Sequence, residues 1–384
     1  MPSRRARFLT VVLVALLLLH GLPWWRLVLA PRWPTAVTTV GSIFTVIALI
    51  GFPLAMWKGH GRAARDGLAV LGDTWLGVIW QLFVWSLIGA LADVFLAVAQ
   101  IPDPARARWS AGAVLVVVAA LCGWGFWQAR RVPPVRTVAV RLPRLGAGLD
   151  GLRLVLITDT HYGPINRARW SARMVQRVND LRPDLLAHAG DLADGSVDRR
   201  REQVAPLGGA SAALARVYIT GNHEYGSGAA QWLQHMSDLG WTVLHNQNIV
   251  IERGGSKLAV AGIDDLSAGS SGVSGHGADL PAALSGLPED LPVVLLAHQP
   301  KSVRMAAPAG IDLQVSGHTH GGQMWPFHYL VRAEQGALAG LSRHGERTVL
   351  YTSRGSGFWG PSFRIFAPNE ITLLLLRAGD AGGR

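Results

Sequence analysis

Five segments of the sequence each consist of a run of apolar residues followed by side chains that could bind metal ions. Imidazole nitrogens combined with carboxylate and amide oxygens suit borderline divalent ions such as Mn, Fe or Zn better than Mg or Ca. The segments are LITDTHYG (156–163), LLAHAGDLADG (185–195), VYITGNHEYG (217–226), VVLLAHQP (293–300) and LQVSGHTHGG (313–322). The candidate ligands in them are Asp159, His161, Asp191, Asp194, Asn222, His223, Glu224, His298, His318 and His320.

Each candidate also has a purely structural explanation. Asp159 could cap a helix, Asn222 could be a turn residue, and His298 could be a hydrogen-bonded core histidine. Five such segments in one domain favour a metal site over five coincidences. His318 and His320 are alternate residues of a turning loop, so they could serve two neighbouring ions.

The sequence after residue 135 indicates which secondary-structure elements position these residues. Short β-rich runs alternate there with polar segments of helical pattern, which is typical of a layered α/β domain. In such folds the binding site lies at the carboxyl ends of the strands. Glycines next to Asp191, Asn222 and His318 allow sharp turns and close approach of the backbone.

The first 150 residues have a different character. They contain 15 Lys and Arg against 5 Asp and Glu, a net charge of +10, whereas residues 151–384 contain 21 against 20. The basic excess surrounds long apolar runs, which indicates membrane topology, and no nucleic-acid partner is expected. Cys122 is the only cysteine, so no intramolecular disulfide can form.

Four apolar stretches, 8–29, 35–57, 74–98 and 111–128, are long enough to span a bilayer. The first could instead be a signal peptide, but further spans follow it, so an anchor is favoured. Flanking cations number 11 on one side and 4 on the other. The 11 are Arg4, Arg5, Arg7, Lys58, Arg62, Arg65, Arg130, Arg131, Arg136, Arg141 and Arg144, and the 4, in the loops of the other side, are Arg26, Arg32, Arg106 and Arg108. They predict a multi-pass protein of the plasma membrane with both termini and the soluble domain in the cytoplasm. Asp93 lies inside the third span, as a functional group or as the partner of a polar neighbour.

The ordered motifs D-x-H, G-D-x-x-D-G, G-N-H-E, A-H-Q-P and G-H-T-H-G-G-Q resemble the calcineurin-like metallophosphoesterase superfamily over roughly residues 135–377. The closing stretch RGSGFWGPSFRIFAPNEITLLLL (354–376) is similar to its branch of transmembrane proteins with a metallophosphoesterase domain. The resemblance implies an α/β fold, an α/β/β/α sandwich of two mixed sheets. The expected organisation is a membrane region (1–130), a linker with the first strand (131–150), the catalytic domain (151–377) and a tail (378–384). Glu224 stands where the superfamily often has Asp.

The resemblance also implies two divalent ions, with Mn, Fe or Zn expected. Four residues would hold the first ion: Asp159, His161, Asp191 and His320. Four would hold the second: Asp191, Asn222, His298 and His318. A hydroxide bridging the ions would attack phosphorus. Asp191 and His223 are the expected catalytic residues, and Asp194 and Gln323 would orient ligands or water or contact the substrate.

The expected function is therefore a membrane-anchored hydrolase of phosphoester or pyrophosphate bonds, with a lipid-linked or nucleotide-glycolipid substrate. Alternatives are a nuclease or nucleotide phosphodiesterase, and a membrane protein that binds a phosphorylated ligand without catalysis. The Gly- and Ser-rich segment 264–280 is expected to be a flexible loop beside the site, in which His276 is solvated rather than a ligand. The aromatic residues of 323–331 either pack on the domain or form an apolar ledge for a lipid or a nucleoside.

Overall fold

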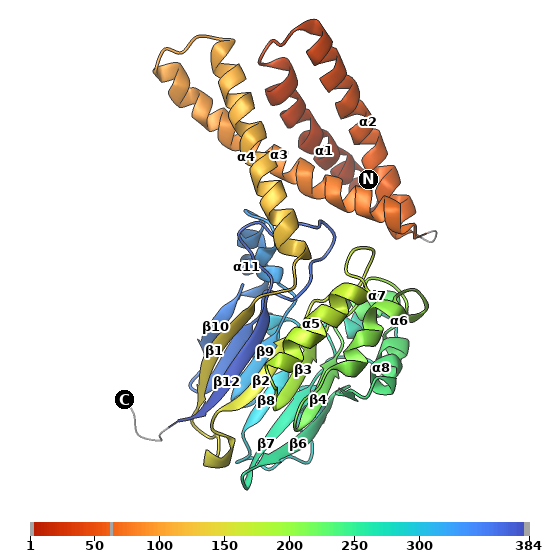
Figure 1. The fold of residues 1–384 in the computed structure, drawn as a ribbon, viewed down its shortest axis with the longest axis vertical. Coiled ribbons are helices and arrows are strands. Elements are labelled where there is room, and N and C mark those ends of the chain that lie inside the picture. The colour runs from red at the N-terminus through yellow and green to blue at the C-terminus, as the bar shows by residue number, and fades with distance from the viewer. Residues whose placement is uncertain (1–3, 62–63, 380–384) are drawn as a thin grey trace. The chain divides into compact units, whose positions relative to one another are not determined.

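A computed structural model describes residues 4–61 and 64–379 and divides the chain into two compact units (Figure 1). The helical unit comprises Met1–Trp127 and Gly360–Ile365, and the α/β unit comprises Gln128–Trp359 and Phe366–Arg384. Arg62, one of the cations used to predict topology, and residues 380–384 of the predicted tail lie outside the described residues.

Four long helices form most of the helical unit: α1 (Arg4–Trp24), continued by a π-helix (Trp25–Leu29), α2 (Thr35–His60), α3 (Asp66–Val98) and α4 (Ala105–Arg130). Within the described residues these are four helices long and apolar enough to cross a membrane. Each predicted span lies inside one of them. Their outer surfaces expose large apolar side chains such as Val40 and Phe95, which is expected of helices solvated by lipid.

Two acidic residues in the interior of α3 have partners. Asp93 forms an ion pair with Arg26 of the π-helix, and Arg26 also donates to Ser110 Oγ at 3.2 Å. Asp73 Oδ1 lies 2.9 Å from His60 Nε2. Because a charge within apolar surroundings is stable only when it is paired, this ion pair accounts for Asp93 structurally.

The segment Gly360–Ile365, here called the return segment, packs against α3 and α4 although it is far from them in sequence. Arg364 donates its backbone N–H to the carbonyl of Gly125 at 2.9 Å, and the Phe363 ring centroid lies 6.1 Å from that of Phe126. Phe363, Arg364 and Ile365 are all buried. A Cβ added at Gly77 of α3 would lie 2.4 Å from the Phe363 ring, so the glycine makes room for this packing.

Two mixed six-stranded sheets form the α/β unit, and several short helices accompany them (Figure 1). The first sheet has the order β1 (Val135–Leu142), β12 (Ile371–Ala378), β2 (Leu152–Ile157), β3 (Leu185–Ala189), β4 (Ala215–Ile219), β5 (Thr242–Val243). The second has the order β10 (Gly340–His344), β11 (Thr348–Thr352), β9 (Leu313–Ser316), β8 (Val293–Leu296), β7 (Ser256–Gly262), β6 (Gln247–Arg253). Strands β2 to β5 are parallel, as are β7, β8, β9 and β11.

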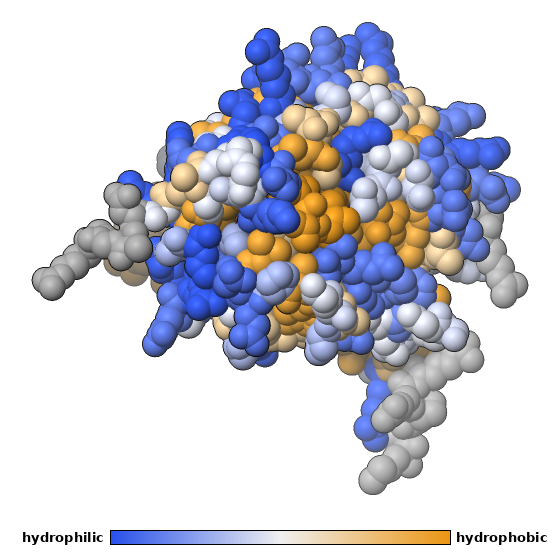
Figure 2. Space-filling view, turned by 90° about the horizontal axis from the view of Figure 1, so that it is seen from below, coloured by the Kyte–Doolittle hydropathy of each residue, from blue (hydrophilic) through white to orange (hydrophobic). Residues whose placement is uncertain are grey.

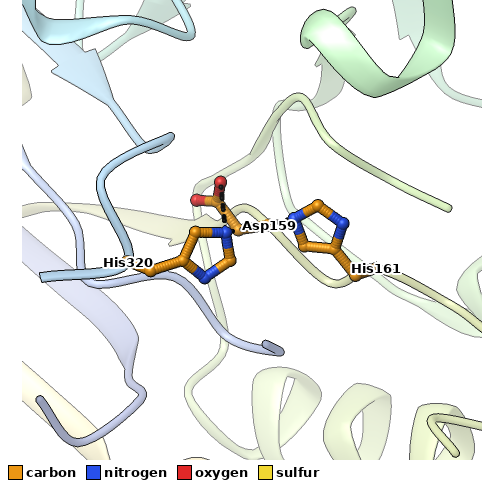
Figure 3. Close-up of side chains that lie close together, drawn as sticks. All are labelled: Asp159, His161 and His320. Carbon is orange, nitrogen blue, oxygen red and sulfur yellow. Dashed lines mark hydrogen bonds and ion pairs between the residues drawn. The ribbon is translucent and has the colours of Figure 1, made fainter. Parts of the chain in front are cut away.

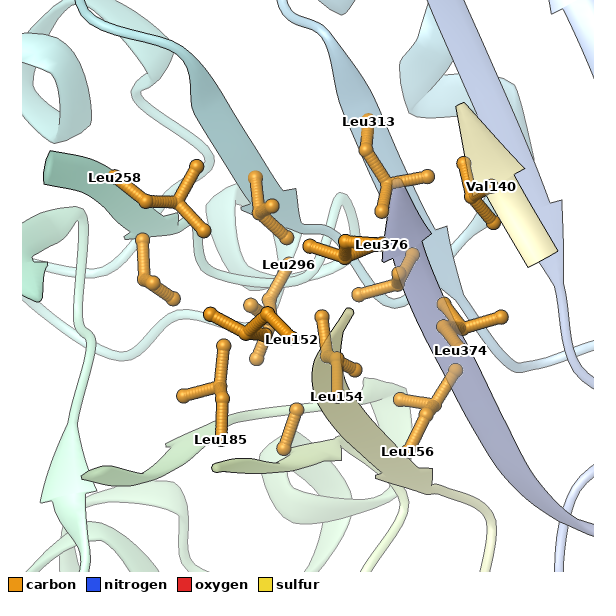
Figure 4. Close-up of a cluster of buried hydrophobic side chains, with 14 of the residues drawn as sticks. Val140, Leu152, Leu154, Leu156, Leu185, Leu258, Leu296, Leu313, Leu374 and Leu376 are labelled. Carbon is orange, nitrogen blue, oxygen red and sulfur yellow. The ribbon is translucent and has the colours of Figure 1, made fainter. Parts of the chain in front are cut away.

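The main core lies between the two sheets, where leucines of β2 and β3 face leucines of β7, β8 and β9 (Figure 4). A second apolar cluster lies on the outer face of the first sheet and includes side chains of α5 (Ala168–Asp180), α6 (Val197–Val204) and α8 (Ala229–Asp238). A third apolar cluster lies on the outer face of the second sheet and includes side chains of α9 (Leu280–Leu284) and α10 (Val303–Ala306). The predicted α/β/β/α sandwich is therefore confirmed.

The remaining helices are short. They are α7 (Asn222–Ser227), α11 (His328–Gln335) and 3₁₀ turns at Ala147–Leu149, Ala205–Gly209, Ala268–Ser270, Pro300–Ser302 and His320–Gly322.

On the face of the molecule shown in Figure 2, hydrophilic residues surround a central stretch of hydrophobic residues.

Candidate metal centre

The five predicted motifs follow five strands whose carboxyl ends meet. Strands β2, β3 and β4 are parallel neighbours in the first sheet, and β8 and β9 are parallel neighbours in the second. The first candidate ligand comes two to three residues after the end of each strand: Asp159, Asp191, Asn222, His298 and His318. The packing of the two sheets thus gathers residues that are far apart in sequence, as expected for sites at carboxyl strand ends.

The backbone at these ligands is held in an uncommon conformation. Five of the seven predicted ligands have positive φ: Asp159 (53°), His161 (41°), Asp191 (52°), His318 (69°) and His320 (51°). Non-glycine residues adopt the left-handed region at a cost and remain there only when surrounding contacts enforce it, which is typical of functional sites. Two glycines allow the close approach. A Cβ at Gly221 would lie 2.2 Å from Asp191 Oδ1, and one at Gly317 would lie 2.2 Å from Asp159 Oδ2.

The first group consists of Asp159, His161 and His320, whose potential ligand atoms lie within 4.8 Å of one another (Figure 3). The Nε2 atoms of His161 and His320 are 3.1 Å apart, and His320 Nε2 is 3.5 Å from Asp159 Oδ1. Two ring nitrogens and a carboxylate oxygen therefore face a common point.

The second group consists of Asp191, His298 and His318, with Asn222 beside it. His298 Nε2 lies 3.1 Å from Asp191 Oδ2, and His318 Nδ1 lies 2.9 Å from Asn222 Oδ1. Asp191 Oδ2 is also 3.6 Å from His161 Nε2 of the first group. Asp191 therefore stands between the two groups.

The chemistry of this arrangement fits metal ions better than hydrogen bonding alone. Among the described residues, the buried atoms Asp159 Oδ2 and His298 Nε2 make no hydrogen bond. The other nitrogens of two histidines are fixed by acceptors. His161 Nδ1 lies 2.9 Å from Asp194 Oδ1, and His298 Nδ1 lies 2.7 Å from the carbonyl of Ala189. Metal-binding histidines commonly have such a partner on the nitrogen that does not bind the ion.

The electrostatic field of the site favours a cation. Burial alone would raise the pKa of Asp191, but His298 and His223 hold it well below its usual value. Conversely, burial lowers the pKa of His298, yet Asp191 and Asp159 raise it well above its ordinary value. The field that retains a proton on His298 would equally attract a divalent ion. Burial and His298 lower the pKa of His318 to about 4, which keeps its ring neutral and able to bind a metal.

Comparison with known proteins agrees with this geometry. The family model for calcineurin-like phosphoesterases matches residues 152–322. A "Transmembrane protein with metallophosphoesterase domain" from Danio rerio is 34% identical over 323 residues, 81% of this chain and 74% of that protein. The chain belongs to the calcineurin-like metallophosphoesterase family. The protein of the same name from Bos taurus is 36% identical, over 69% of this chain and 62% of that one.

Similarity to solved structures is more distant. A 5'-nucleotidase precursor from Thermus thermophilus is 17% identical over 54% of this chain and 49% of that chain, with a TM-score of 0.37. Family membership and the candidate ligand groups together support a phosphoesterase that uses divalent metals.

His223 and Asp194 lie beside the two candidate ligand groups of this metallophosphoesterase. His223 Nδ1 is 2.8 Å from Asp194 Oδ1, and its backbone N–H donates to Asp191 Oδ1 at 2.9 Å. Asp194 thus contacts both His161 and His223. Burial would lower the pKa of His223, but Asp191 and Asp194 raise it to about 10. These two carboxylates therefore favour the protonated imidazole.

Three further residues support the site and were not predicted in these roles. Glu224 accepts hydrogen bonds from the backbone N–H groups of Asp191 (3.0 Å) and Leu192 (2.7 Å), so it holds the loop of the shared aspartate. Burial and the charge of Asp191 raise the pKa of Glu224 to about 7. Trp359 lies against His223, with ring centroids 5.7 Å apart. Gln323 makes two hydrogen bonds to the backbone of Trp359.

The structure contradicts the expectation for His276 and the expectation that the aromatic residues of 323–331 pack into the domain. His276 is not solvated, because its side chain is only 9% exposed and lies near Tyr225 and Asp264. In the 323–331 segment, Phe327, Tyr329 and Leu330 are exposed by 44%, 65% and 61%. These three side chains are therefore not buried in the domain, and the apolar ledge stays a prediction.

Proposed function

We propose that this protein is a membrane-anchored phosphoesterase with two divalent ions. Asp159, His161, Asp191 and His320 would hold one ion, and Asp191, Asn222, His298 and His318 the other. The observation that carries the proposal is the position of Asp191, whose Oδ2 atom lies 3.1 Å from His298 Nε2 and 3.6 Å from His161 Nε2. One carboxylate can then serve both ions and offset their mutual repulsion. When bound, two such ions activate water as a nucleophile and neutralise the oxygens of the phosphoryl group.

The protein's own residues have separable tasks around that chemistry. Asp194 accepts from His161 and so keeps its Nε2 directed toward the first ligand group. Asn222 contributes an uncharged oxygen, which limits the negative charge of the site and leaves it attractive to phosphate. Glu224 accepts a hydrogen bond from the backbone N–H of Asp191 and so holds the backbone of that residue in position.

His223 is the proposed general acid. Its Nδ1 is held by Asp194, so Nε2 is the nitrogen that can donate a proton to the oxygen of the leaving group. Protonation raises the rate most when the leaving group is poor, because such a group cannot depart as an anion.

The proposed substrate is a phosphoester or pyrophosphate attached to a lipid. The ledge of Phe327, Tyr329 and Leu330 begins four residues after Gln323. Trp359 and Phe366, exposed by 52% and 58%, flank the return segment, which packs among helices long and apolar enough to cross a bilayer. Exposed aromatic residues next to membrane-spanning elements are typical of the interface where lipid head groups lie.

The proposal is tested with full-length protein in detergent or vesicles. Incubating a membrane lipid extract and a nucleotide extract with wild type and with Asp191→Asn, in the presence of Mn²⁺, should show by mass spectrometry one lipid-linked phosphoester consumed by wild type alone. If wild type and Asp191→Asn convert every species equally, including activated mono- and diesters, the protein is not a phosphoesterase.

The multi-pass topology in the plasma membrane, with the α/β unit in the cytoplasm, remains part of the proposal. A single cysteine placed at the exposed position Glu252 in a Cys122→Ser background provides the test. Labelling by a membrane-impermeant maleimide only after the cells are opened supports the proposed side, and labelling of intact cells reverses it.

A further inference from the structure

A further cluster of side chains that could bind a metal ion lies outside the two ligand groups described above. It consists of His245, Asp264 and His276, whose potential ligand atoms all lie within 4.8 Å of one another. His245 Nδ1 is 2.6 Å from Asp264 Oδ1, and His276 Nδ1 is 3.5 Å from Asp264 Oδ2. The two imidazole rings lie 4.4 Å apart, centroid to centroid, on the same carboxylate.

Three separate segments bring these residues together. His245 lies in the connection between β5 and β6, Asp264 follows the end of β7, and His276 comes from the Gly- and Ser-rich loop that leads to α9. The loop offers few apolar side chains for burial, and Gly272 and Gly275 have positive φ. Hydrophobic packing therefore contributes little to holding His276 in place.

The cluster has the composition and spacing of a transition-metal site. Two imidazoles and one carboxylate suit Zn and its neighbours. Ligand atoms in a tetrahedral Zn site are about 3.3 Å apart, given bonds of about 2 Å. The contact of 3.5 Å between His276 and Asp264 is close to that spacing, whereas the 2.6 Å hydrogen bond between His245 and Asp264 would lengthen when an ion replaces its proton. Asp264 is almost fully buried, whereas the His245 side chain is 34% exposed, so an ion can enter from solvent on that side.

Surrounding groups orient the carboxylate of the cluster. Asp264 Oδ2 accepts the backbone N–H of Gly277 at 3.0 Å, which limits how the carboxylate can turn, as outer partners do at metal sites. The Tyr225 hydroxyl lies 3.2 Å from His276 Nδ1, and it would have to give up that nitrogen to an ion bound there.

The cluster is also linked to the dinuclear centre through its neighbours in sequence. Asp265, next to Asp264, accepts from Gln299 Nε2 with both oxygens at 3.0 Å, and Gln299 follows His298. Tyr225 belongs to α7, which begins with Asn222. An ion at the cluster would therefore fasten the 264–276 loop to elements that carry the catalytic ligands.

We propose that His245, Asp264 and His276 bind a third divalent transition-metal ion, which holds the 264–276 loop in place beside the dinuclear centre. The proposal does not depend on catalysis by that centre.

Zinc is the probe for the test. Full-length protein without an affinity tag is stripped with chelator, reloaded with Zn²⁺, and its metal content is measured per chain. His276→Gln and His245→Gln are each expected to bind one ion fewer than wild type and to be cleaved at least tenfold faster by protease within the loop. The control His344→Gln replaces a histidine of β10 that bonds to Ser342, and it should retain the wild-type content and cleavage rate.

The variants also separate this proposal from that of the dinuclear centre. Asp191→Asn should lose zinc from the dinuclear centre, and adding His276→Gln should remove one further ion. If both cluster variants bind as much zinc as His344→Gln and resist protease equally, the cluster is a hydrogen-bond network and the proposal is wrong. Because two histidines are tested separately, a folding defect in one variant leaves the other to decide.

Discussion

Gln323 and Trp359 are joined by two hydrogen bonds: Gln323 Nε2 donates to the Trp359 carbonyl at 2.7 Å, and the Trp359 N–H donates to Gln323 Oε1 at 3.0 Å. Gln323 comes three residues after the ligand His320, and the Trp359 ring lies against His223. The pair therefore connects the loop of the last metal ligand with the proposed general acid. Trp359 is also the last residue before the return segment of the helical unit.

Gln323→Ala is expected to lower the rate of hydrolysis about tenfold. Each of the two hydrogen bonds contributes about 0.7 kcal/mol, and their combined loss of about 1.4 kcal/mol corresponds to a tenfold change. Steady-state kinetics with a chromogenic phosphoester measures the change, and metal content should stay at the wild-type value. Loss of metal together with activity would instead assign Gln323 to the metal site itself.

Asp191→Asn is expected to lower activity by at least about 100-fold and to reduce metal content. The neutral amide cannot balance the charge of two cations, and ligand substitutions at metal sites typically have effects of this size or larger. Elemental analysis and a phosphoester assay on the same sample provide the measurement. An Asp191→Asn protein with full metal content and full activity would contradict the shared position of this carboxylate.

His223→Gln is expected to slow the hydrolysis of alkyl phosphoesters by about 100-fold or more, and of p-nitrophenyl esters much less, because only the former need a protonated leaving group. Asp191 and Asp194 raise the pKa of the imidazole to about 10. Since the acid form is the active one, wild-type activity on alkyl esters should fall as the pH rises through the pKa of His223. The variant should lack that alkaline limb. Equal losses on both ester types would exclude the general-acid role.

Asp194→Asn is expected to weaken metal binding by roughly 10–100-fold, because it removes the charged partner of His161. Burial would raise the pKa of Asp194, but His161 and His223 hold it well below its usual value, so the carboxylate is ionised throughout the neutral range. Titration with Mn²⁺ compares the affinities. The control Asp198→Asn alters an acidic residue in the first turn of α6 and should leave the affinity unchanged.

Gly317→Ala is expected to prevent formation of the metal centre, because the added Cβ would lie 2.2 Å from both Asp159 Oδ2 and Thr158 Oγ1. Both are buried, so neither can move away cheaply. Gly269→Ala, at a position with no neighbouring atom within 4 Å, is the matched control. Thermal unfolding and zinc content should separate the two variants, and equal values would show that the site tolerates the extra carbon.

Much of the fold could be predicted because its determinants are local. Each long helix can be recognised from its own run of apolar residues, and each strand from the apolar run that alternates with polar segments. The candidate metal ligands were recognisable because ligand types recur at strand ends, and parallel strands necessarily place those ends together. The grouping into two sets follows from the packing of one sheet on the other.

Other features could not be predicted, because they depend on contacts between distant segments. Nothing in the composition of 264–280 places His276 against His245 and Asp264, and a Gly- and Ser-rich stretch ordinarily indicates a solvated loop. Glu224 was considered only as a candidate ligand and as a departure from the usual Asp, yet its role depends on the distance to the Asp191 backbone. Arg26 was counted as a loop cation, although it lies in the π-helix that continues α1 and forms an ion pair with Asp93 of α3.

The return segment has a practical consequence for anyone who wishes to produce the catalytic half by itself. Cutting the chain at residue 130 would remove α3 and α4 and leave Phe363 and Ile365, which are buried against them, facing water. Such a truncated protein should be poorly soluble and should bind detergent through the uncovered side chains. Replacing Phe363 and Ile365 with polar residues should restore solubility, which would make crystallisation of the catalytic half practicable.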